Sequence, residues 1–292
     1  MQSIRSDRAA LLASCLLLAI PASAFAQDRE GNHDVSCMPP SGAASLWQRL
    51  EVRFLLIGEL HGTRETPAAF GELVCSAATE ARRRVLVGLE FPEAARAAFG
   101  AYIASMGTAE DRSVFLAESG WLVLARSQFP DGRTSEAMLE MVERLRGLRA
   151  AGFYIFVTTF QRPFPAPRES QTPLEIGYAD SLREAFDAGA YDLAIALVGN
   201  LHARRITVTP AGGPPFDPMA MHLPREATLT LKAITGDGEA WNCQRTGCGV
   251  HKRQAEPLGT TLGIVLGDTL APGYDGVIGI GPITASSPTL ED

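Results

Sequence analysis

The sequence predicts an α/β fold: a single domain with a mostly parallel central sheet, helices on both of its faces and a more β-rich C-terminal third. One observation is that short, largely apolar runs without polar alternation recur between segments of helical spacing. Strands buried on both faces have this composition, and the helices between them imply right-handed parallel crossovers. A second observation is that residues 209–226 are rich in Pro and Gly, and that no strong helical pattern follows them.

The apolar runs define the predicted strands. In chain order they are 52–57, 85–89, 153–158, 193–198, 227–234, 261–266 and 276–280. The last three have no strong helix between them, so we expect them to extend the sheet in a partly antiparallel manner.

The predicted helices begin at capping residues or show helical periodicity. Thr66 is interpreted as an N-cap with Pro67 at the first helical position, which predicts a helix to about Arg83. Pro92 opens the next helix, and Gly152 ends a periodic helix over 135–150. A further helix is expected over 179–188, whereas residues 107–133 are expected to be irregular.

The first 26 residues have the composition of a cleaved signal peptide. Arg5 and Arg8 precede an apolar stretch that is too short for a membrane anchor, and Ala24-Phe25-Ala26 is an A-x-A cleavage site. We therefore expect an exported protein, periplasmic or secreted, with no membrane span. Residues 27–46 would form an N-terminal arm and residues 47–292 the α/β domain.

Cysteine usage agrees with export. Without Cys15 of the signal peptide, four cysteines remain, an even number that is typical of an oxidising compartment. We expect Cys37–Cys75 to tie the arm to the first helix, and Cys243–Cys248 to close a short loop. A zinc site made of all four cysteines is the alternative, but their spacing lacks the usual paired knuckles.

Charge and motifs exclude several classes of function. The formal net charge is −7, and −8 once Arg5, Asp7 and Arg8 are removed with the signal peptide. Without a basic face, binding to nucleic acid or to anionic membranes is not expected. The sequence also contains no G-x-S-x-G elbow, P-loop or dinucleotide fingerprint. A small-molecule or peptide substrate remains.

A short pattern that occurs twice predicts the site. Gly58-Glu59-Leu60-His61 and Gly199-Asn200-Leu201-His202 each follow a predicted buried strand, and Glu90 ends the apolar run 85–89. In open α/β sheets, ligands bind beyond the carboxyl ends of the strands. Glu59, His61, Glu90 and His202 are therefore expected to share one cleft.

Two imidazoles and two carboxylates at one edge suit water activation in either of two ways. All four side chains could hold a divalent metal such as Mn, Co or Zn, with a bound water of lowered pKa. Without a metal, His61 would act as general base, oriented by Glu59 or Glu90, while Arg64 and His202 position the electrophile. Gln161, just past the third strand, is a candidate substrate donor, and His222 a candidate extra ligand. Both routes lead to hydrolysis.

These motifs resemble a known superfamily. The residues that carry the resemblance are Gly58–Glu65, Leu89-Glu90, Gly199–Ala203, Tyr274–Val277 and Gly281–Thr284. Over roughly residues 50–285 the chain resembles the superfamily of erythromycin esterases, ChaN-type haem-binding proteins and Tiki/TraB proteins.

Each branch of that superfamily implies a different function. The esterase branch implies that Glu59, His61, Glu90 and His202 form a catalytic cleft. The Tiki branch implies a metal-dependent peptidase, and the ChaN branch implies haem binding without turnover. Glu59 and His61 are one residue apart, as in ChaN-like sequences, whereas the following residues 62–65 are esterase-like. An exported ester or amide hydrolase is the main prediction, with a haem- or metal-binding protein as the alternative.

Overall fold

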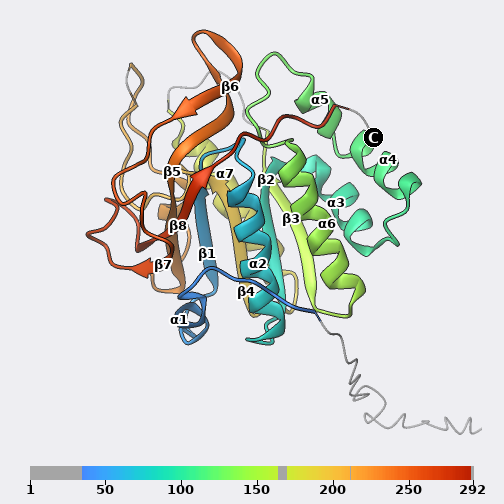
Figure 1. Cartoon of the computed structure of the whole chain (residues 1–292). Coiled ribbons are helices and arrows are strands. Elements are labelled where there is room, and N and C mark those ends of the chain that lie inside the picture. The colour runs from blue at the N-terminus through green and yellow to red at the C-terminus, as the bar shows by residue number, and fades with distance from the viewer. Residues whose placement is uncertain (1–34, 164–169, 211, 291–292) are drawn as a thin grey trace, which may run out of the picture. The chain divides into compact units, whose positions relative to one another are not determined.

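Eight strands form one sheet in the part of the chain that the structure, a computed structural model, describes: residues 35–163, 170–210 and 212–290 (Figure 1). The strand order is β3-β2-β4-β1-β5-β8-β7, and β6 pairs with β5 beside this path. The strands are β1 Phe54–Glu59, β2 Val85–Pro92, β3 Ile155–Gln161, β4 Leu193–Gly199, β5 Thr228–Gln244, β6 Gly247–Arg253, β7 Gly263–Leu266 and β8 Gly276–Ile283. The predicted signal peptide and the start of the arm lie outside the described residues.

The sheet is mostly parallel, as predicted. All pairs along the path from β3 to β8 are parallel, β7 is antiparallel to β8, and β6 is antiparallel to the end of β5. Strand β1 lies inside the sheet, and all six of its residues are buried. Its side chains alternate between two apolar cores, with Leu55 and Ile57 in one and Phe54 and Leu56 in the other. This double burial explains why the run is apolar throughout.

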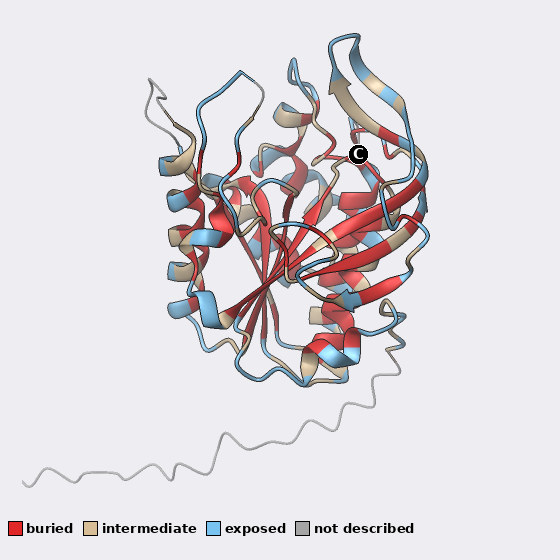
Figure 2. Cartoon of the chain, turned by 90° about the vertical axis from the view of Figure 1, so that its left-hand side faces the viewer, coloured by how far each residue is buried: buried red, intermediate tan, exposed pale blue. Residues whose placement is uncertain are grey.

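Helices cover both faces, unequally. The helices are α1 Ala43–Trp47, α2 Glu65–Thr79, α3 Arg96–Ala104, α4 Ala109–Glu118, α5 Trp121–Ala125, α6 Glu136–Ala150 and α7 Thr172–Asp187. The core on one face contains residues of α1 to α6, whereas α7 and residues from the segment after β4 fill the core on the other. In Figure 2 the buried strands twist between these layers, whose outer surfaces are exposed. No helix of the described residues combines the length and hydropathy needed to cross a bilayer.

Two helix boundaries differ from the prediction. Helix α2 begins at Glu65 and ends at Thr79, so Thr66 lies inside it and is not its cap. The Thr66 side chain instead accepts a hydrogen bond from Thr63 at 3.1 Å, which explains why a cap-forming residue occurs there. Helix α7 begins at Thr172, seven residues before the predicted start, with proline in its first turn.

The segment 107–133, predicted to be irregular, contains α4 and α5. Thr108 and Asp111 form a capping box at the start of α4, a signal that the sequence analysis overlooked. Strand β6, which was not predicted, forms a hairpin with the extended end of β5. Finally, β2 continues to Pro92, so that Glu90 lies within the strand and not beyond it.

The structure contains both expected cysteine pairs. Cys37–Cys75 joins the segment before α1 to α2, with Cα atoms 5.8 Å apart. Cys243–Cys248 joins β5 to β6 within the hairpin. These bonds are compatible with an exported protein.

Residues after β8 form backbone hydrogen bonds with the loops that precede α2 and α6. Isolated bridges pair Thr63 with Ala285 and Ser135 with Pro288. The backbone N–H of Ser286 donates to the carbonyl of Gly62 at 3.0 Å, and Trp241 N–H of β5 donates to the same carbonyl at 2.9 Å. The residue that follows His61 is therefore held by two segments distant in sequence.

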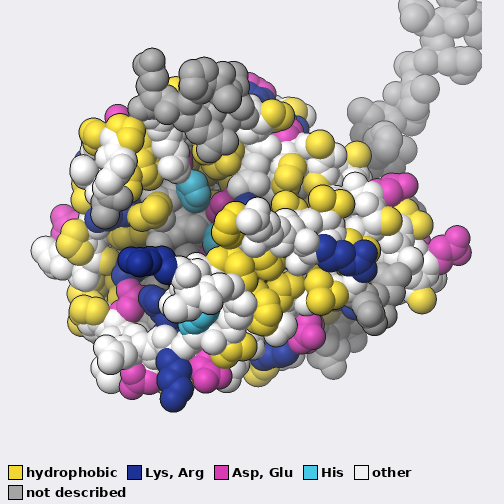
Figure 3. Space-filling view, turned by 90° about the horizontal axis from the view of Figure 1, so that it is seen from above, with side chains coloured by type: hydrophobic (Ala, Val, Ile, Leu, Met, Phe, Trp, Pro, Cys, Tyr) yellow, Lys and Arg dark blue, Asp and Glu magenta, His cyan; other side chains and the backbone are white. Residues whose placement is uncertain are grey.

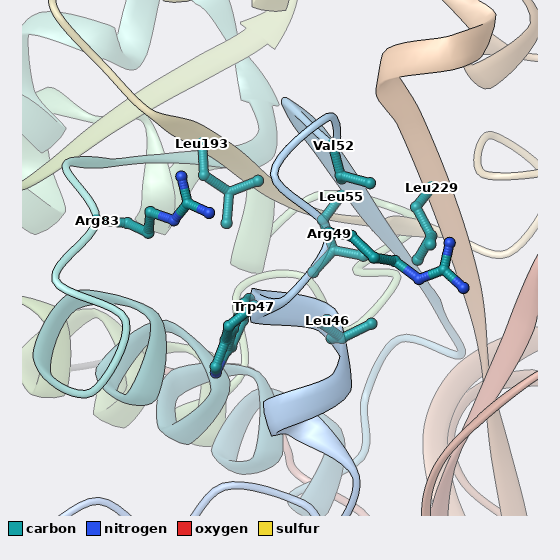
Figure 4. A pocket seen from close by; sticks show the side chains of 8 residues that line it. All are labelled: Leu46, Trp47, Arg49, Val52, Leu55, Arg83, Leu193 and Leu229. Atoms are coloured by element: carbon teal, nitrogen blue, oxygen red, sulfur yellow. The ribbon is translucent and has the colours of Figure 1, made fainter.

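At the amino edge of the sheet, a small pocket lies between α1 and the beginnings of β1, β4 and β5 (Figure 4). Its lining is mainly apolar, including Leu46, Leu55 and Leu229, with the Arg49 and Arg83 side chains beside them. No acid or histidine lines this pocket, so it offers no group for acid–base chemistry.

The two disulfides are expected to contribute unequally to stability, because a cross-link across a longer loop removes more entropy from the unfolded chain. Cys37 and Cys75 are 38 positions apart, and Cys243 and Cys248 only five. Paired serine substitutions should lower the free energy of unfolding by about 4 kcal/mol at the first site and about 2 kcal/mol at the second. Urea titration measures both values. Equal losses, or differences that persist in reductant, would contradict the loop-length explanation.

Candidate active site

Three adjacent strands bring the predicted site residues together at the carboxyl edge of the sheet. Strands β2, β4 and β1 lie side by side, and the register pairs Glu59 of β1 with Gly199 of β4. The two repeated motifs are therefore neighbours in space. Seen from above, this edge shows histidine side chains beside a depression bordered by hydrophobic and arginine side chains (Figure 3).

His61 and Glu59 form one imidazole–carboxylate pair. Glu59 is buried at the end of β1, and its Oε1 lies 2.9 Å from Nδ1 of His61. The other ring nitrogen, Nε2, lies 3.7 Å from Glu90. Gly62 then turns the chain with a φ of 79°, where a Cβ would meet the Trp241 carbonyl at 1.9 Å. Only glycine fits here, because the β5 backbone crosses directly against the turn.

His202 and Glu175 form a second pair of the same kind. Nδ1 of His202 lies 2.8 Å from both carboxylate oxygens of Glu175, which is fully buried on α7. Nε2 of His202 lies 3.5 Å from Glu90. The two histidines thus approach one carboxylate from different sides.

Glu90 is the centre of this arrangement. Its Oε2 accepts a hydrogen bond of 2.6 Å from the backbone N–H of Gly199, and its Oε1 accepts one of 3.2 Å from the Gln161 amide. Arg133 donates to the Glu90 backbone carbonyl at 2.9 Å and lies 3.4 Å from Oε1. With His61 at the end of β1, four chain segments therefore contact Glu90.

Gly199 leaves space between the catalytic candidates. A Cβ at this position would lie 3.1 Å from Nε2 of His61, 3.4 Å from the His202 ring and 3.5 Å from Glu90. A side chain here would fill the space that the two rings and the carboxylate border. The glycine exit of the strand, visible in the sequence motif, is what keeps this space open.

Burial and mutual charge set the protonation of these groups. Burial opposes the charge of His202, but Glu90 and Glu175 outweigh it and raise its pKa to about 9. For His61, burial is likewise outweighed, by the hydrogen bond and charge of Glu59 and by Glu90, so its pKa is also raised. Burial acts to raise the pKa of Glu90, but the two histidines, Arg133 and the Gly199 N–H lower it to about 2.

The three further predicted residues, Gln161, Arg64 and His222, differ in placement. Gln161 lies in the site and contacts Glu90. Arg64 instead points its guanidinium at Glu136 and Glu140 of α6, at 3.1 and 3.3 Å, on an exposed surface. His222 lies in a 3₁₀ turn, where its Nε2 is 3.2 Å from the Asp217 carbonyl. The structure therefore does not bring Arg64 to the histidines.

Sequence reasoning missed two side chains of the site, Glu175 and Arg133. Glu175 precedes Tyr178, Ala179 and Leu182 at helical spacing, and all of them are buried. A carboxylate on the apolar face of a helix was the signal, but the predicted helix began too late to include it. Arg133 lies between predicted elements and has no comparable signal; its guanidinium is shared between Glu90 and Asp131.

The donor chemistry suits a metal ion, but the separations do not. Imidazole nitrogens and carboxylate oxygens are ordinary zinc ligands, and carboxylates behind both rings are common around metals. Among the described residues, however, the ligand atoms of one group of three lie within 4.8 Å of one another: those of Cys37, Glu72 and Cys75, whose cysteines form a disulfide. The histidines and Glu90 do not meet this condition.

A haem iron meets a similar obstacle. It would need an imidazole nitrogen that no carboxylate already approaches. Nδ1 of each histidine is bonded to a carboxylate, and Nε2 of each faces Glu90. The arrangement therefore fits proton transfer better than iron ligation.

Comparison with known proteins yields relatives by structure alone. No protein-family model matches the sequence, and no curated protein matches it. A solved succinoglycan biosynthesis protein has 11% identity and a TM-score of 0.64, covering 84% of this chain and 92% of its own. A mutant of erythromycin esterase EreC in its open conformation has 10% identity and a TM-score of 0.60, covering 85% and 95%. The type III effector HopBA1 has 16% identity and a TM-score of 0.50, covering 86% and 98%.

These similarities extend over nearly the whole α/β domain. The expected α/β fold is confirmed, and the chain shares it with the solved erythromycin esterase and the succinoglycan biosynthesis protein. At such low identity the comparison establishes the fold and not the activity.

The site is expected to make stability depend on pH in both directions. The ordinary pKa of 4.5 for Glu90 falls to about 2, so its contribution exists above pH 4.5 and is lost as the pH falls towards 2. The ordinary pKa of 6.5 for His202 rises to about 9, so its contribution exists below pH 6.5 and is lost as the pH rises towards 9.

Urea unfolding of wild type and His202→Gln across this range measures the alkaline limb. The stability difference between them should shrink from pH 6.5 to pH 9. His251→Gln, in the hairpin strand β6, is the control. A difference that stays constant with pH would refute the proposed protonation of His202.

Proposed function

We propose that this protein is a hydrolase of carbonyl esters or amides in which His61 is the general base. The observation that carries the proposal is the orientation of His61. Its Nδ1 is held by Glu59, while its Nε2 borders the space that Gly199 leaves open. An imidazole fixed at one nitrogen and free at the other is the usual arrangement for activating water.

The mechanism follows from the two nitrogens. Donation of the Nδ1 proton to Glu59 leaves the lone pair of Nε2 directed at the space beside Gly199. A water molecule there would lose a proton to Nε2 as it attacks the carbonyl carbon. The negative charge of buried Glu59 stabilises the imidazolium that forms. No step requires a metal or another cofactor.

Charge around the site favours uncharged substrates. The acidic groups are Glu59, Glu90, Glu175 and Asp131, and the cationic ones are Arg133 and, when protonated, the two histidines. The guanidinium of Arg133 is already shared between Asp131 and Glu90. A phosphate or carboxylate substrate would meet excess negative charge. We therefore propose a small neutral ester or amide, or a peptide bond, as the group attacked.

The proposal includes export. The signal-peptide pattern over residues 1–26 and the two disulfides support action in the periplasm or outside the cell.

Replacement of His61 tests this function. His61→Ala should lower kcat/KM by about 10²–10⁴-fold on any ester or peptide that the wild type hydrolyses, since the water-activating group is lost. The fold should persist, because His61 lies outside both apolar cores, but thermal stability should fall, because Glu59 and Glu90 each lose a partner. His251→Ala serves as the control. The haem-binding alternative would prevail if a broad substrate panel showed no turnover while the protein bound haem stoichiometrically and lost its Soret band on His61 replacement.

The rate should also depend on the protonation of His61. Its pKa is raised above 6.5, so kcat/KM should fall as the pH is lowered through a value above 6.5 and the base becomes protonated. A pH–rate profile in buffers with added chelator measures this limb. If kcat/KM fell only below pH 6, or if the fall were unchanged in the residual activity of His61→Ala, then protonation of His61 would be excluded as its cause.

A further inference from the structure

We propose that Glu175 is a positioning residue that makes His202 the general acid of the reaction, protonating the leaving group as the carbonyl bond breaks. This inference rests on the proposed hydrolase function. It assigns different tasks to two histidine–carboxylate pairs whose histidines end the same Gly-x-Leu-His pattern.

Both carboxyl oxygens of Glu175 act as hydrogen-bond acceptors. Oε1 accepts from the Gln171 amide at 2.5 Å, and Oε2 accepts from the Met219 backbone N–H at 2.9 Å. Nδ1 of His202 lies 2.8 Å from each oxygen. Towards His202, Glu175 is therefore placed as an acceptor.

A partner placed as an acceptor fixes the tautomer of His202. Its Nδ1 must carry a proton and donate it to Glu175. Any second proton on the ring is then on Nε2, the nitrogen that lies 3.5 Å from Glu90 and borders the space at Gly199. This proton is the one available for transfer to a substrate.

The other pair is built differently. Oε1 of Glu59 contacts His61, but buried Oε2 has no hydrogen-bond partner among the described residues. Burial raises the pKa of Glu59 more than His61 lowers it, whereas Glu175 accepts hydrogen bonds at both oxygens. Because both of its oxygens are hydrogen-bonded, the Glu175 carboxylate holds a protonated His202 ring more firmly than Glu59 holds His61. The pair with Glu175 therefore suits the acid, and the pair with Glu59 suits the base.

The surroundings of His202 support a protonated ring. Glu90 of β2 and Glu175 of α7 face it with negative charge, and Arg133 opposes them from the segment before α6. The Tyr178 ring packs against it with centroids 5.7 Å apart, and His61 faces the far side of Glu90. The two negative carboxylates outweigh the one positive guanidinium, so the surrounding charge favours the imidazolium form of His202.

The proton balance closes over one cycle. Nε2 of His61 takes a proton from the attacking water, and the oxygen of that water bonds to the carbonyl carbon. As the bond to the leaving group breaks, its electron pair takes the proton from Nε2 of His202, which releases an alcohol or amine. The proton on His61 then replaces the one lost from His202, either across Glu90 or through solvent. The net reaction is the addition of one water across the bond.

Leaving-group dependence tests the assignment. Two esters of the same acid are compared, one with p-nitrophenol and one with a simple alkanol. The phenolate departs without protonation, but the alkoxide needs the acid. Glu175→Gln and His202→Gln should each slow alkyl ester hydrolysis by at least about 10²-fold and change aryl ester hydrolysis little. His61→Ala should slow both.

Matched variants separate positioning from damage to the fold. Glu143→Gln on α6 removes a carboxylate that also accepts hydrogen bonds from two neighbours, Tyr102 and Arg146, and should leave both rates unchanged. Glu175→Gln added to His202→Gln should have no further effect on alkyl ester hydrolysis, because Glu175 acts through His202. Glu175→Asp provides the same comparison should the glutamine variant not fold.

The outcomes are distinguishable. Equal slowing of both esters by the Glu175 and His202 variants, or no slowing, overturns this inference and leaves the role of His61 intact. A wild type that hydrolyses neither ester nor any peptide overturns the proposed function itself. Selective loss of alkyl ester hydrolysis supports both.

Discussion

The structure of the site depends on keeping one buried carboxylate, that of Glu90, ionised. An unpaired charge in such a position would cost several kcal/mol. The protein offsets this with the backbone N–H of Gly199, the amide of Gln161, the guanidinium of Arg133 and two imidazoles. These five groups come from four chain segments, since Gly199 and His202 belong to one motif, so the Glu90 charge requires that β1, β3, β4 and the segment before α6 all be in place.

The backbone contributes as much as the side chains to placing these segments around Glu90. Parallel pairing of β1 with β4 sets Glu59 beside Gly199, and β2 on the other side of β4 adds Glu90. Glycine at position 199 lets the amide reach the carboxylate and leaves room before both rings. The same parallel register that buries the apolar strands thus aligns the polar groups at their ends.

The sequence predicts those parts of the site that follow directly from strand burial. Polar residues at the ends of apolar runs can be recognised in the sequence because the change from apolar to polar residues is abrupt. Such residues are Glu59, His61, Glu90, Gln161 and His202. Glu175 is hidden because it reaches the site from a helix, and Arg133 because no periodic pattern governs its segment. Arg64, next to the motif in sequence, turns towards α6, where it forms ion pairs with two exposed glutamates.

The double hydrogen bond to the Gly62 carbonyl also has a meaning for biosynthesis. One donor is Trp241 and the other is Ser286, so the turn after His61 is completed by residues translated 179 and 224 positions after Gly62. An incomplete chain therefore lacks these hydrogen bonds to the turn until segment 284–290 has been synthesised. In the proposed hydrolase, the turn that carries the general base would be ordered only when nearly the whole chain is present.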